Sequence, residues 1–388
     1  MAQVPPVVLS LSARVLVNVE ALNMAETVGD VSRHRRAPVV VYGNGRYSVV
    51  YVPTVSGESL AHHYQRLLAS IAERDGLPVT DMDAKGFFLK YASNNIIGKY
   101  YMQDLAKHCP DLPERLKPED ESGGKKGKRG KSDAEKASAI TPCEMEAVLV
   151  KASTVADVAG FLYTDMLIKR TSRVRFSYMV PAIDAAKQGA VASYPQLHVR
   201  YSPEAAKGEQ AMYYVESGSA LYTLSTVLVA SDIAELEYCS QYDQQLAGCW
   251  SRCKQELANE KPKRVKAALK ALLALIDGMV FGAKRSRYLP VWEVKSLIVA
   301  VSKGPVEFVV SPAITTSYAE STARRARVIG QALGTQIKLY MYDGEGLPID
   351  GKLKEELKLE TRDGHSEALK AAIEGLEEML GIEKGSSA

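Results

Sequence analysis

Residues 13–18 read ARVLVN, residues 39–52 read VVVYGNGRYSVVYV and residues 56–71 read SGESLAHHYQRLLASI. The first segment alternates and is rich in β-branched residues, which predicts a strand. In the second, an Asn-Gly pair separates two β-branched runs; this predicts a hairpin, because Gly tolerates the positive φ of a tight turn. In the third, apolar residues recur at helical spacing after a natural N-cap, Ser56, which predicts a helix.

Segments further along the chain extend this order of elements. Strand patterns occur at 173–180, 221–230, 297–301, 306–310 and 336–342, helix patterns at 142–150, 262–282, 321–333 and 366–380, and a second hairpin pattern pairs 197–201 with 212–215. Without its insertions the chain reads βαββαβ, the ferredoxin-like order that RNA-recognition motifs share with many unrelated proteins. The sequence therefore predicts an α+β fold with a ferredoxin-like βαββαβ core and large insertions.

Composition limits the class of protein. The chain has 388 residues, 46% apolar and 24% charged, with a net charge of +3, so a packed core is expected and wholesale disorder is excluded. No segment has the length and apolarity of a membrane-spanning helix. Five cysteines in a chain of this length favour a reducing cytoplasm over a disulfide framework, and Cys239, Cys249 and Cys253 are predicted to be small buried hydrophobic residues.

Four short clusters carry 13 of the 49 basic residues, and eleven of these are arginines. Arg grips phosphate through a planar fork and also stacks on bases. The clusters are Arg33-His34-Arg35-Arg36, Lys169-Arg170 with Arg173 and Arg175, Lys284-Arg285 with Arg287, and Arg324-Arg325 with Arg327. If they converge they form a groove for a single strand, whereas each cluster taken alone is more simply explained as a solvated face.

Other motifs carry weaker signals. Ser56-Gly57 at a helix start is either an anion site or an ordinary N-cap. Glu58 and His62 share a helix face but lack the further ligands that zinc needs. The Lys-rich segment 114–137 has too few apolar residues to fold and is predicted to be a mobile loop. We find no catalytic constellation, no metal site and no cofactor motif.

Together these motifs resemble the DevR family, which supplies the repeated backbone subunit of CRISPR-associated Cascade complexes, and the archaeal type I-A version is the nearest match. The resemblance runs through most of residues 10 to 330. The segments that carry it are ARVLVNVEALN…SRHRRAPVV, VPTVSGESLAHHYQ, IKRTSRVRFSYMVP, LHVRYSP…MYYVESGSALYTLS and FGAKRSRYLPV. It implies an α+β fold with a modified RNA-recognition-motif core and large insertions. The Lys-rich insertion at 118–136 and the tail after about residue 345 have no assigned counterpart.

The resemblance implies a non-enzymatic subunit that binds CRISPR RNA through its backbone and stacks on copies of itself in a filament. It implies other Cascade subunits and target DNA, reached through the guide, as further partners, and a cytoplasmic location. Sequence-tolerant binding of this kind requires phosphate contacts instead of base readout. The residues that the resemblance marks for RNA binding are Arg33, His34, Arg35, Arg36, Ser56, Gly57, Lys169, Arg170, Arg173, Arg175, His198, Arg200, Lys284, Arg285, Ser286 and Arg287.

The same resemblance implies a division of the chain. Residues 10–74 and 150–310 would form the palm-like core, 75–149 a helical insertion, 182–212 a thumb-like hairpin and 311–388 an extension packed on the core.

The alternative function is a metal-dependent, RNA-guided ribonuclease, as in related CRISPR classes, with Asp30 or Glu58 as the candidate acid. Neither residue lies in an evident cluster of carboxylates, which metal-assisted phosphoryl chemistry usually needs.

Overall fold

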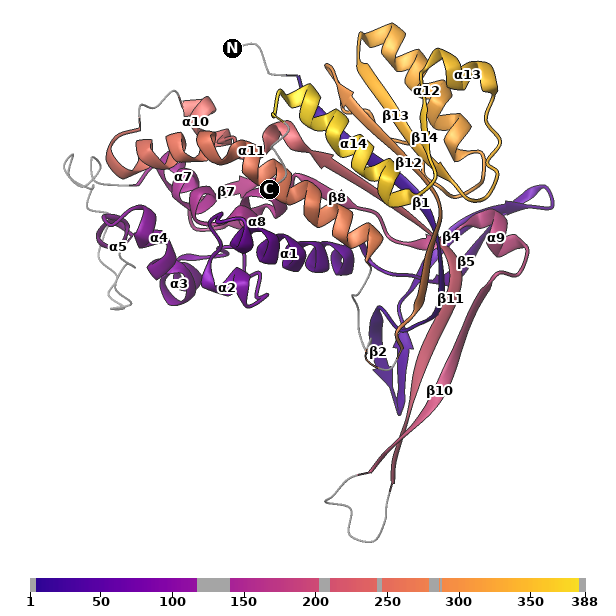
Figure 1. Cartoon of the computed structure of the whole chain (residues 1–388). Helices are drawn as coiled ribbons and strands as arrows, with labels where there is room; N and C mark the ends of the chain where they lie inside the picture. Colours follow the sequence, from indigo (N-terminus) through magenta and orange to yellow (C-terminus); the bar gives the residue numbers. More distant parts are fainter. Residues whose placement is uncertain are drawn as a thin grey trace. The chain divides into compact units, whose positions relative to one another are not determined.

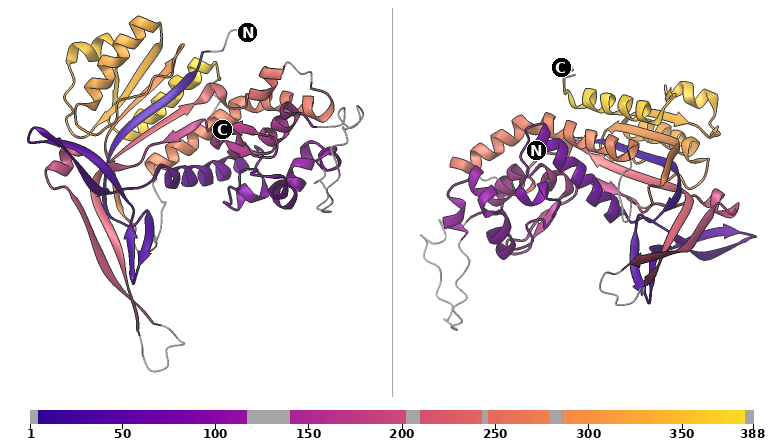
Figure 2. Two further views of the ribbon diagram at one scale, coloured as in Figure 1. Left: turned by 180° about the vertical axis from the view of Figure 1, so that it is seen from behind. Right: turned by 60° about the horizontal axis from the view of Figure 1, so that its bottom comes forward.

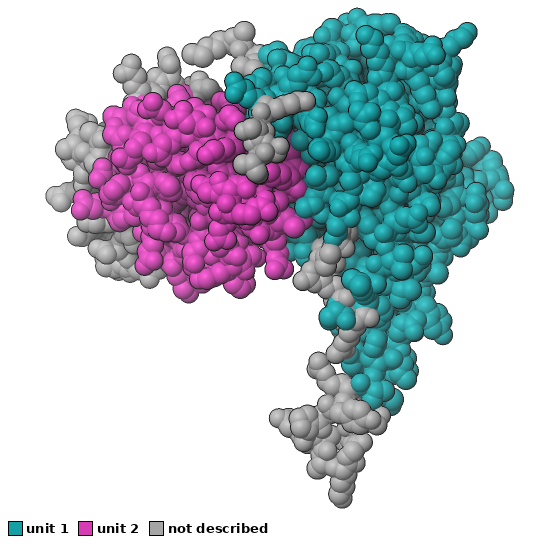
Figure 3. All heavy atoms as spheres, in the orientation of Figure 1, with its two compact units in different colours: residues 1–64, 174–231, 272–388 teal, residues 65–173, 232–271 magenta. Residues whose placement is uncertain are grey.

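The computed structural model describes residues 5–116, 140–201, 210–242, 246–278, 286 and 288–383. The chain separates into two compact units (Figure 3). The first, which we call the sheet unit, comprises residues 1–64, 174–231 and 272–388. The second, the helical unit, comprises residues 65–173 and 232–271. Two helices, α1 (Gly57–Arg74) and α11 (Gly248–Asp277), begin in one unit and end in the other.

Strand β1 (Val7–Glu20) is the centre of the sheet unit (Figure 1). It pairs antiparallel with β11 (Gln210–Val229) on one edge and with β12 (Val291–Lys303) on the other. Successive residues from Val7 to Val15 are buried, so the strand is covered on both faces; one face carries apolar residues and the other the buried polar residues Ser10, Ser12 and Arg14. Beyond β12 the sheet continues with β13 (Gln336–Asp343) and β14 (Glu360–Arg362).

The other edge of β11 is shared by several short strands. Thr226 pairs with Leu11 of β1 and also with Phe176 of β8 (Val174–Phe176), so β8 lies on the side of β11 opposite β1. On this edge β11 also pairs with β9 (Val180–Pro181) and with β10 (Val191–Tyr201). Strand β3 (Val31–His34) pairs with Tyr214 and Val215 across from β10, hence on the same edge as β1, and it pairs in turn with β2 (Met24–Val28).

Two β-hairpins extend from the sheet unit (Figure 2). The first is formed by β4 (Arg36–Gly43) and β5 (Arg46–Pro53) and confirms the predicted Asn-Gly hairpin, with φ of 51° at Asn44 and 76° at Gly45. The second, the β10–β11 ribbon, pairs Val191–Tyr201 with residues 210–220. Its strands contain the predicted pairing of 197–201 with 212–215, while residues 202–209 between them lie outside the described part.

Two predicted strands differ from the structure. The second hairpin strand and the strand predicted at 221–230 are one strand, β11, because Glu216 and Ser217 between them are buried and continue the pairing. No strand forms at 306–310, where the apolar run packs into the core instead. There Ser10 Oγ donates to Phe308 O at 3.0 Å and accepts from Val310 N at 3.2 Å, in place of a strand partner.

Helices complete both units. In the sheet unit, α14 (His365–Leu380) packs against β12 and β13, and Gly381, with φ of 69°, ends it as predicted. The other helices of this unit are α9 (Ile183–Lys187), α12 (Tyr318–Leu333) and α13 (Gly351–Glu356). The helical unit contains α2 (Asp81–Ala84), α3 (Asn94–Ile96), η1 (Ile97–Tyr101), α4 (Met102–His108), α5 (Leu112–Arg115), α7 (Pro142–Ala152), α8 (Thr154–Ala159), α10 (Glu237–Tyr242), and the strands β6 (Phe161–Tyr163) and β7 (Ile168–Arg170).

The predicted insertion and loop map onto these units as follows. The helical unit includes most of the segment predicted as a helical insertion and also residues 150–173 and 232–271. The predicted Lys-rich loop lies, from residue 117 onward, outside the described residues. None of the described helices is long and apolar enough to cross a membrane.

Candidate nucleic-acid interface

Three of the segments marked by the sequence meet in the sheet unit. Ala21, Val215 and Tyr288 form a buried apolar cluster, with Met24 and Tyr213 packed against it. Ala21 and Met24 open the segment that leads to the Arg33–Arg36 cluster, Val215 belongs to β11, and Tyr288 follows the basic residues 284–287. We call this place the ribbon base. The cluster therefore packs the described ends of these three segments against one another.

His198 joins the ribbon to the segment after the basic loop. Its Nε2 lies 2.6 Å from the Tyr288 hydroxyl, and its ring stacks on Tyr213 with a centroid distance of 5.4 Å. His198 is half-buried at the ribbon base. Of the neighbouring predicted residues, Ser286 is exposed, whereas Lys284, Arg285, Arg287 and the side chain of Arg200 lie outside the described part of the structure.

The Arg33–Arg36 cluster presents two half-exposed guanidiniums. Arg33 lies 3.9 Å from the exposed Glu26 carboxylate, and Arg36 pairs with Glu216 of β11. Strand β3 is held there by a parallel pairing with β11. An open hollow of about 590 Å³ is lined by Arg33, Arg35 and Arg36 together with Glu26, Pro195 and Glu216. The structure thus places cationic side chains around a surface cavity at the ribbon base.

His34 has a different position from its arginine neighbours. Its side chain is fully buried, with Nε2 2.6 Å from Glu20 and Nδ1 2.9 Å from the Arg35 carbonyl oxygen. The Arg35 carbonyl oxygen only accepts, so Nδ1 donates to it, and the negative charge of Glu20 beside Nε2 favours the cationic form of the imidazole. Burial alone would lower the pKa of His34 and raise that of Glu20; their mutual hydrogen bond and charge outweigh it, so the His34 pKa is raised and the Glu20 pKa lowered. His34 therefore anchors the cluster and does not reach a ligand.

Glu216 is the residue that the sequence analysis missed. Its carboxylate accepts from the His34 backbone N–H at 2.9 Å, from Ser193 and from Arg36. Burial raises its pKa, but these donors outweigh that effect and the pKa is lowered. Glu216 follows Arg36 by 180 positions, so no local pattern could reveal the pair.

Ser56 and Gly57 have ordinary structural roles. Ser56 is buried, and its Oγ accepts from Ser59 N at 3.2 Å, while its own N–H donates to Asn23. A Cβ on Gly57 would lie 2.4 Å from the Phe176 carbonyl oxygen. The glycine is therefore required by the close approach to β8, and these residues fit the N-cap alternative of the sequence analysis.

The cluster at 169–175 is divided between the two units. Arg175 belongs to the sheet unit, is half exposed and pairs with Glu307. Lys169 is exposed in the helical unit. Arg173 is buried, donating to the Asp232 carbonyl oxygen at 3.2 Å and pairing with Glu237 at 2.7 Å.

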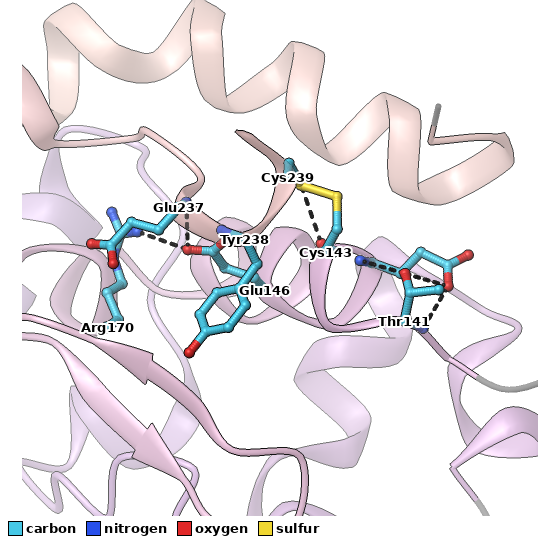
Figure 4. The surroundings of a disulfide bond; sticks show 8 residues. Thr141, Cys143, Glu146, Arg170, Glu237, Tyr238 and Cys239 are labelled. Carbon is cyan, nitrogen blue, oxygen red and sulfur yellow. Dashed lines mark hydrogen bonds and ion pairs between the residues drawn. A yellow bond between two sulfur atoms is a disulfide. The ribbon is translucent and has the colours of Figure 1, made fainter. Parts of the chain in front are cut away.

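Arg170 is fully buried in the helical unit. Its guanidinium pairs with Glu146 at 3.4 Å (Figure 4). It also pairs with Asp157 and donates to the Glu235 carbonyl oxygen at 2.7 Å. Asp157 also pairs with Arg264 at 3.0 Å; burial would raise its pKa, but the two guanidiniums hold it below its usual value. Arg170 thus belongs to an internal ion-pair network and cannot contact RNA in this arrangement.

The cysteines correct another expectation. A disulfide joins Cys143 to Cys239 (Figure 4). A second joins Cys109 to Cys249, also within the helical unit, and Cys253 is free and buried. Spacing along the chain could not show this, because the partners are 96 and 140 residues apart. The expectation of unpaired cysteines was therefore wrong for four of them.

The two acidic residues considered for catalysis, Asp30 and Glu58, are both exposed. Within the described ranges, no group of three or more His, Cys, Asp or Glu residues could hold a metal ion.

The Arg324–Arg327 cluster lies on α12, where Arg324 pairs with Glu320 and Arg327 with Glu356.

Comparisons with known proteins place the chain in a family. A family model described as "CRISPR-associated negative auto-regulator DevR/Csa2" matches residues 11–323. The chain is 36% identical to "CRISPR-associated aCascade subunit Cas7/Csa2 2" of Saccharolobus solfataricus, over 88% of this chain and 94% of the relative. It is 34% identical to "CRISPR-associated protein Cas7/Csa2 1" of the same organism, over 76% of this chain and 80% of the relative. A solved chain of a "CRISPR RNA-guided surveillance complex, pre-nicking" aligns over 95% of this chain and all of its own, with 11% identity and a TM-score of 0.49. This chain belongs to the DevR/Csa2 family of CRISPR-associated proteins.

Proposed function

We propose that this chain is a guide-RNA-binding backbone subunit of a Cascade-type complex. In this role it oligomerises along CRISPR RNA, holds the RNA backbone without regard to sequence and leaves the bases free to pair with target DNA. Its partners are the RNA, further copies of itself and other Cascade subunits, and its role is binding, not catalysis. A relative with 36% identity is itself named as an aCascade subunit, which supports this assignment.

The observation that carries the proposal is the meeting of segments at the ribbon base. Three residues far apart in sequence belong to or pack against one buried cluster: Met24, which pairs with His34 of the Arg33–Arg36 cluster, Val215 of the β10–β11 ribbon, and Tyr288, which follows the basic residues 284–287. Arg33 and Arg36 have exposed fractions of 53% and 49%, so their guanidiniums are available to a ligand in the adjoining hollow. Guanidiniums grouped around an open hollow suit a phosphodiester backbone.

The sheet is consistent with an RNA-recognition-motif core. Strands β1, β8, β11 and β12, with α1 after β1 and α11 before β12, follow the chain order βαββαβ. In space the order is β12, β1, β11, β8, and each neighbouring pair is antiparallel. This arrangement supports the proposed ferredoxin-like core, with the β10–β11 ribbon as the thumb-like insertion.

The proposed interface is narrower than the set first marked in the sequence. Its described members in the sheet unit are Arg33, Arg35, Arg36, Arg175, His198 and Ser286, which are exposed or partly exposed. Arg200, Lys284, Arg285 and Arg287 stay in it as predictions from the sequence, and Lys169, which is exposed in the helical unit, is a separate prediction. His34, Ser56, Gly57, Arg170 and Arg173 are left out, because their polar groups are engaged inside the protein.

The test measures the binding of purified protein to labelled single-stranded RNA over a series of salt concentrations. We expect steep salt dependence, little effect of RNA sequence, and multimers that grow with RNA length. The double variant Arg33→Gln/Arg36→Gln should reduce the slope of log affinity against log salt by roughly 1.4, at about 0.7 per phosphate contact on a single strand.

The matched control removes the same charge from another surface of the sheet unit. Arg324→Gln/Arg327→Gln on α12 should leave the slope unchanged. Absence of RNA binding at low salt, or equal effects of the two double variants, would contradict the proposal. Regular Mg²⁺-dependent cleavage of RNA complementary to a bound guide would favour the ribonuclease alternative.

A further inference from the structure

One face of the β4–β5 hairpin is apolar and uncovered. The register places three cross-strand pairs on this face: Pro38 with Tyr51, Val40 with Val49, and Tyr42 with Tyr47. All six residues are exposed, and the tyrosines at 42, 47 and 51 have exposed fractions of 52%, 76% and 68%. The residues of β4 on the opposite face, Ala37, Val39 and Val41, are half-buried. The structure therefore presents a flat strip of valine and tyrosine side chains to solvent.

Such a strip needs a binding partner. An isolated two-stranded sheet is only marginally stable in water, and exposed apolar strands promote aggregation unless something covers them. Contiguous apolar patches of this kind generally mark interaction sites. The question is which class of partner the chemistry of the hairpin fits.

The charge of the surrounding segment favours a polyanion. Residues 31–57 contain four arginines and no aspartate or glutamate. Three of these arginines precede or open β4, and the fourth, Arg46, is exposed at the tip beside the Asn-Gly turn. Arg46 has no carboxylate partner among the residues that the structure describes. A basic segment with an aromatic face matches the pattern by which proteins bind single-stranded nucleic acid.

The tyrosines have the geometry that stacking requires. The rings of Tyr42 and Tyr47 lie 4.8 Å apart across the hairpin and are tilted by 50° to each other. Tyr47 and Tyr51 lie on the same face of one strand four residues apart, which is about 13 Å along the strand. Unpaired bases stack on such rings whatever their sequence, because every base has a π-face.

The hairpin also continues directly from the proposed RNA interface. Strand β4 begins at Arg36, the last residue of the Arg33–Arg36 cluster. We propose that the Tyr42, Tyr47 and Tyr51 face is a stacking platform for unpaired bases of a single nucleic-acid strand that passes the Arg33–Arg36 cluster. The platform rests on the function proposed above, and adds to its backbone contacts a second kind of contact, with the bases.

The test compares tyrosine variants of the full chain. The variant Tyr47→Ala/Tyr51→Ala should bind a uridine homopolymer about 25-fold or more weakly, since stacking on each of the two rings contributes about a factor of five or more. The variant Tyr47→Phe/Tyr51→Phe keeps both rings and should bind like the wild type. Tyr100→Ala removes an exposed tyrosine of the helical unit and should change nothing.

The salt series separates stacking from charge. The Tyr→Ala variant should lose affinity with an unchanged salt slope, because no cation is removed, whereas Arg33→Gln/Arg36→Gln lowers the slope. A thymidine homopolymer in a parallel series identifies the strand. A loss confined to RNA indicates the guide, and a loss that also affects DNA indicates that the platform accepts a DNA strand as well.

Failure of the platform and failure of the proposed function give different results. If the wild type binds no RNA at low salt, both are wrong. If the wild type binds and the arginine variants behave as expected while Tyr47→Ala/Tyr51→Ala binds like the wild type, only the platform is wrong. Loss of self-association in sedimentation velocity, without loss of RNA affinity, would assign the face to contact between copies and overturn the platform.

Discussion

In the helical unit the guanidinium of Arg170 is fully buried between two carboxylates, whereas in the sheet unit those of Arg33 and Arg36 are half exposed beside an open hollow. All three arginines come from short basic runs. The difference lies in the carboxylates that the fold supplies: Glu146 and Asp157 enclose Arg170, while the carboxylate that Arg33 meets among the described residues is the exposed Glu26, at 3.9 Å. A basic run can thus hold one unit together or present charge to a ligand.

The largest expected effect is on the buried network. Arg170→Ala should lower the free energy of unfolding by about 3–5 kcal/mol, because it leaves Glu146 and part of Asp157 buried without their partner. Chemical denaturation followed by circular dichroism measures this loss.

The matched control is the neighbouring residue. Lys169 is exposed, so Lys169→Ala should change the free energy of unfolding by no more than about 0.5 kcal/mol. Similar losses for the two variants would remove the distinction between the buried and the exposed members of this cluster.

The comparison also shows how far the sequence could predict the structure. The hairpin at 39–52 and the helix after Ser56 followed from local patterns, because turn chemistry and periodicity act over a few residues. The strand at 306–310 did not, because Ser10, almost 300 positions away, takes the place of a strand partner.

The candidate site was less accessible to prediction than the fold. The basic clusters were visible as arginine-rich runs, but their burial depends on carboxylates such as Glu216 and Asp157 that lie far away or carry no local signal. The disulfide partners are separated by about a hundred residues, and no motif linked them. Non-local pairing therefore decided which of the marked residues could face a ligand.

The second prediction concerns the covalent links of the helical unit. Cys143→Ser/Cys239→Ser should lower the free energy of unfolding by about 2–4 kcal/mol, since the disulfide closes a long loop in the unfolded chain. RNA affinity should be unchanged, because the exposed arginines at the ribbon base belong to the sheet unit. Urea titrations of the wild type and the variant under oxidising conditions measure the loss.

Urea titration of the wild type in the presence of a reductant is the control for this prediction. The reductant opens both disulfides, so it should lower the free energy of unfolding of the wild type by at least as much as Cys143→Ser/Cys239→Ser does. If reductant leaves the wild-type denaturation midpoint in place, the helical unit does not depend on its disulfides.

The third prediction uses the His34–Glu20 pair, which is buried like Arg170 but titrates. The pKa of His34 is higher in the folded than in the unfolded protein, so its proton stabilises the fold fully below about pH 6.5, and this stability is lost as the pH rises through the pKa of the folded state. The pKa of Glu20 is lower in the folded protein, so its ionised form stabilises the fold above about pH 4.5, and this stability is lost as the pH falls through the pKa of the folded state. Each unit of pKa difference contributes about 1.4 kcal/mol.

Denaturation midpoints across the pH range test this pair. The wild type should lose stability on the alkaline side of the His34 pKa, and His34→Gln should abolish that part of the profile. Tyr222 donates to Glu20 at 2.8 Å, so Tyr222→Phe should keep the His34 step while weakening the acid one. A flat wild-type profile above neutrality would show that His34 is not cationic in the folded protein.

The smallest expected effect on stability is that of Arg33→Gln. Its guanidinium is 53% exposed and its ion pair with Glu26 is long, so the free energy of unfolding should change by less than about 0.5 kcal/mol. The same substitution should lower RNA affinity and the salt slope, which a stabilising arginine would not do. If Arg33→Gln instead unfolds the protein at lower denaturant without affecting RNA binding, Arg33 behaves like Arg170, and exposure ceases to distinguish the two roles.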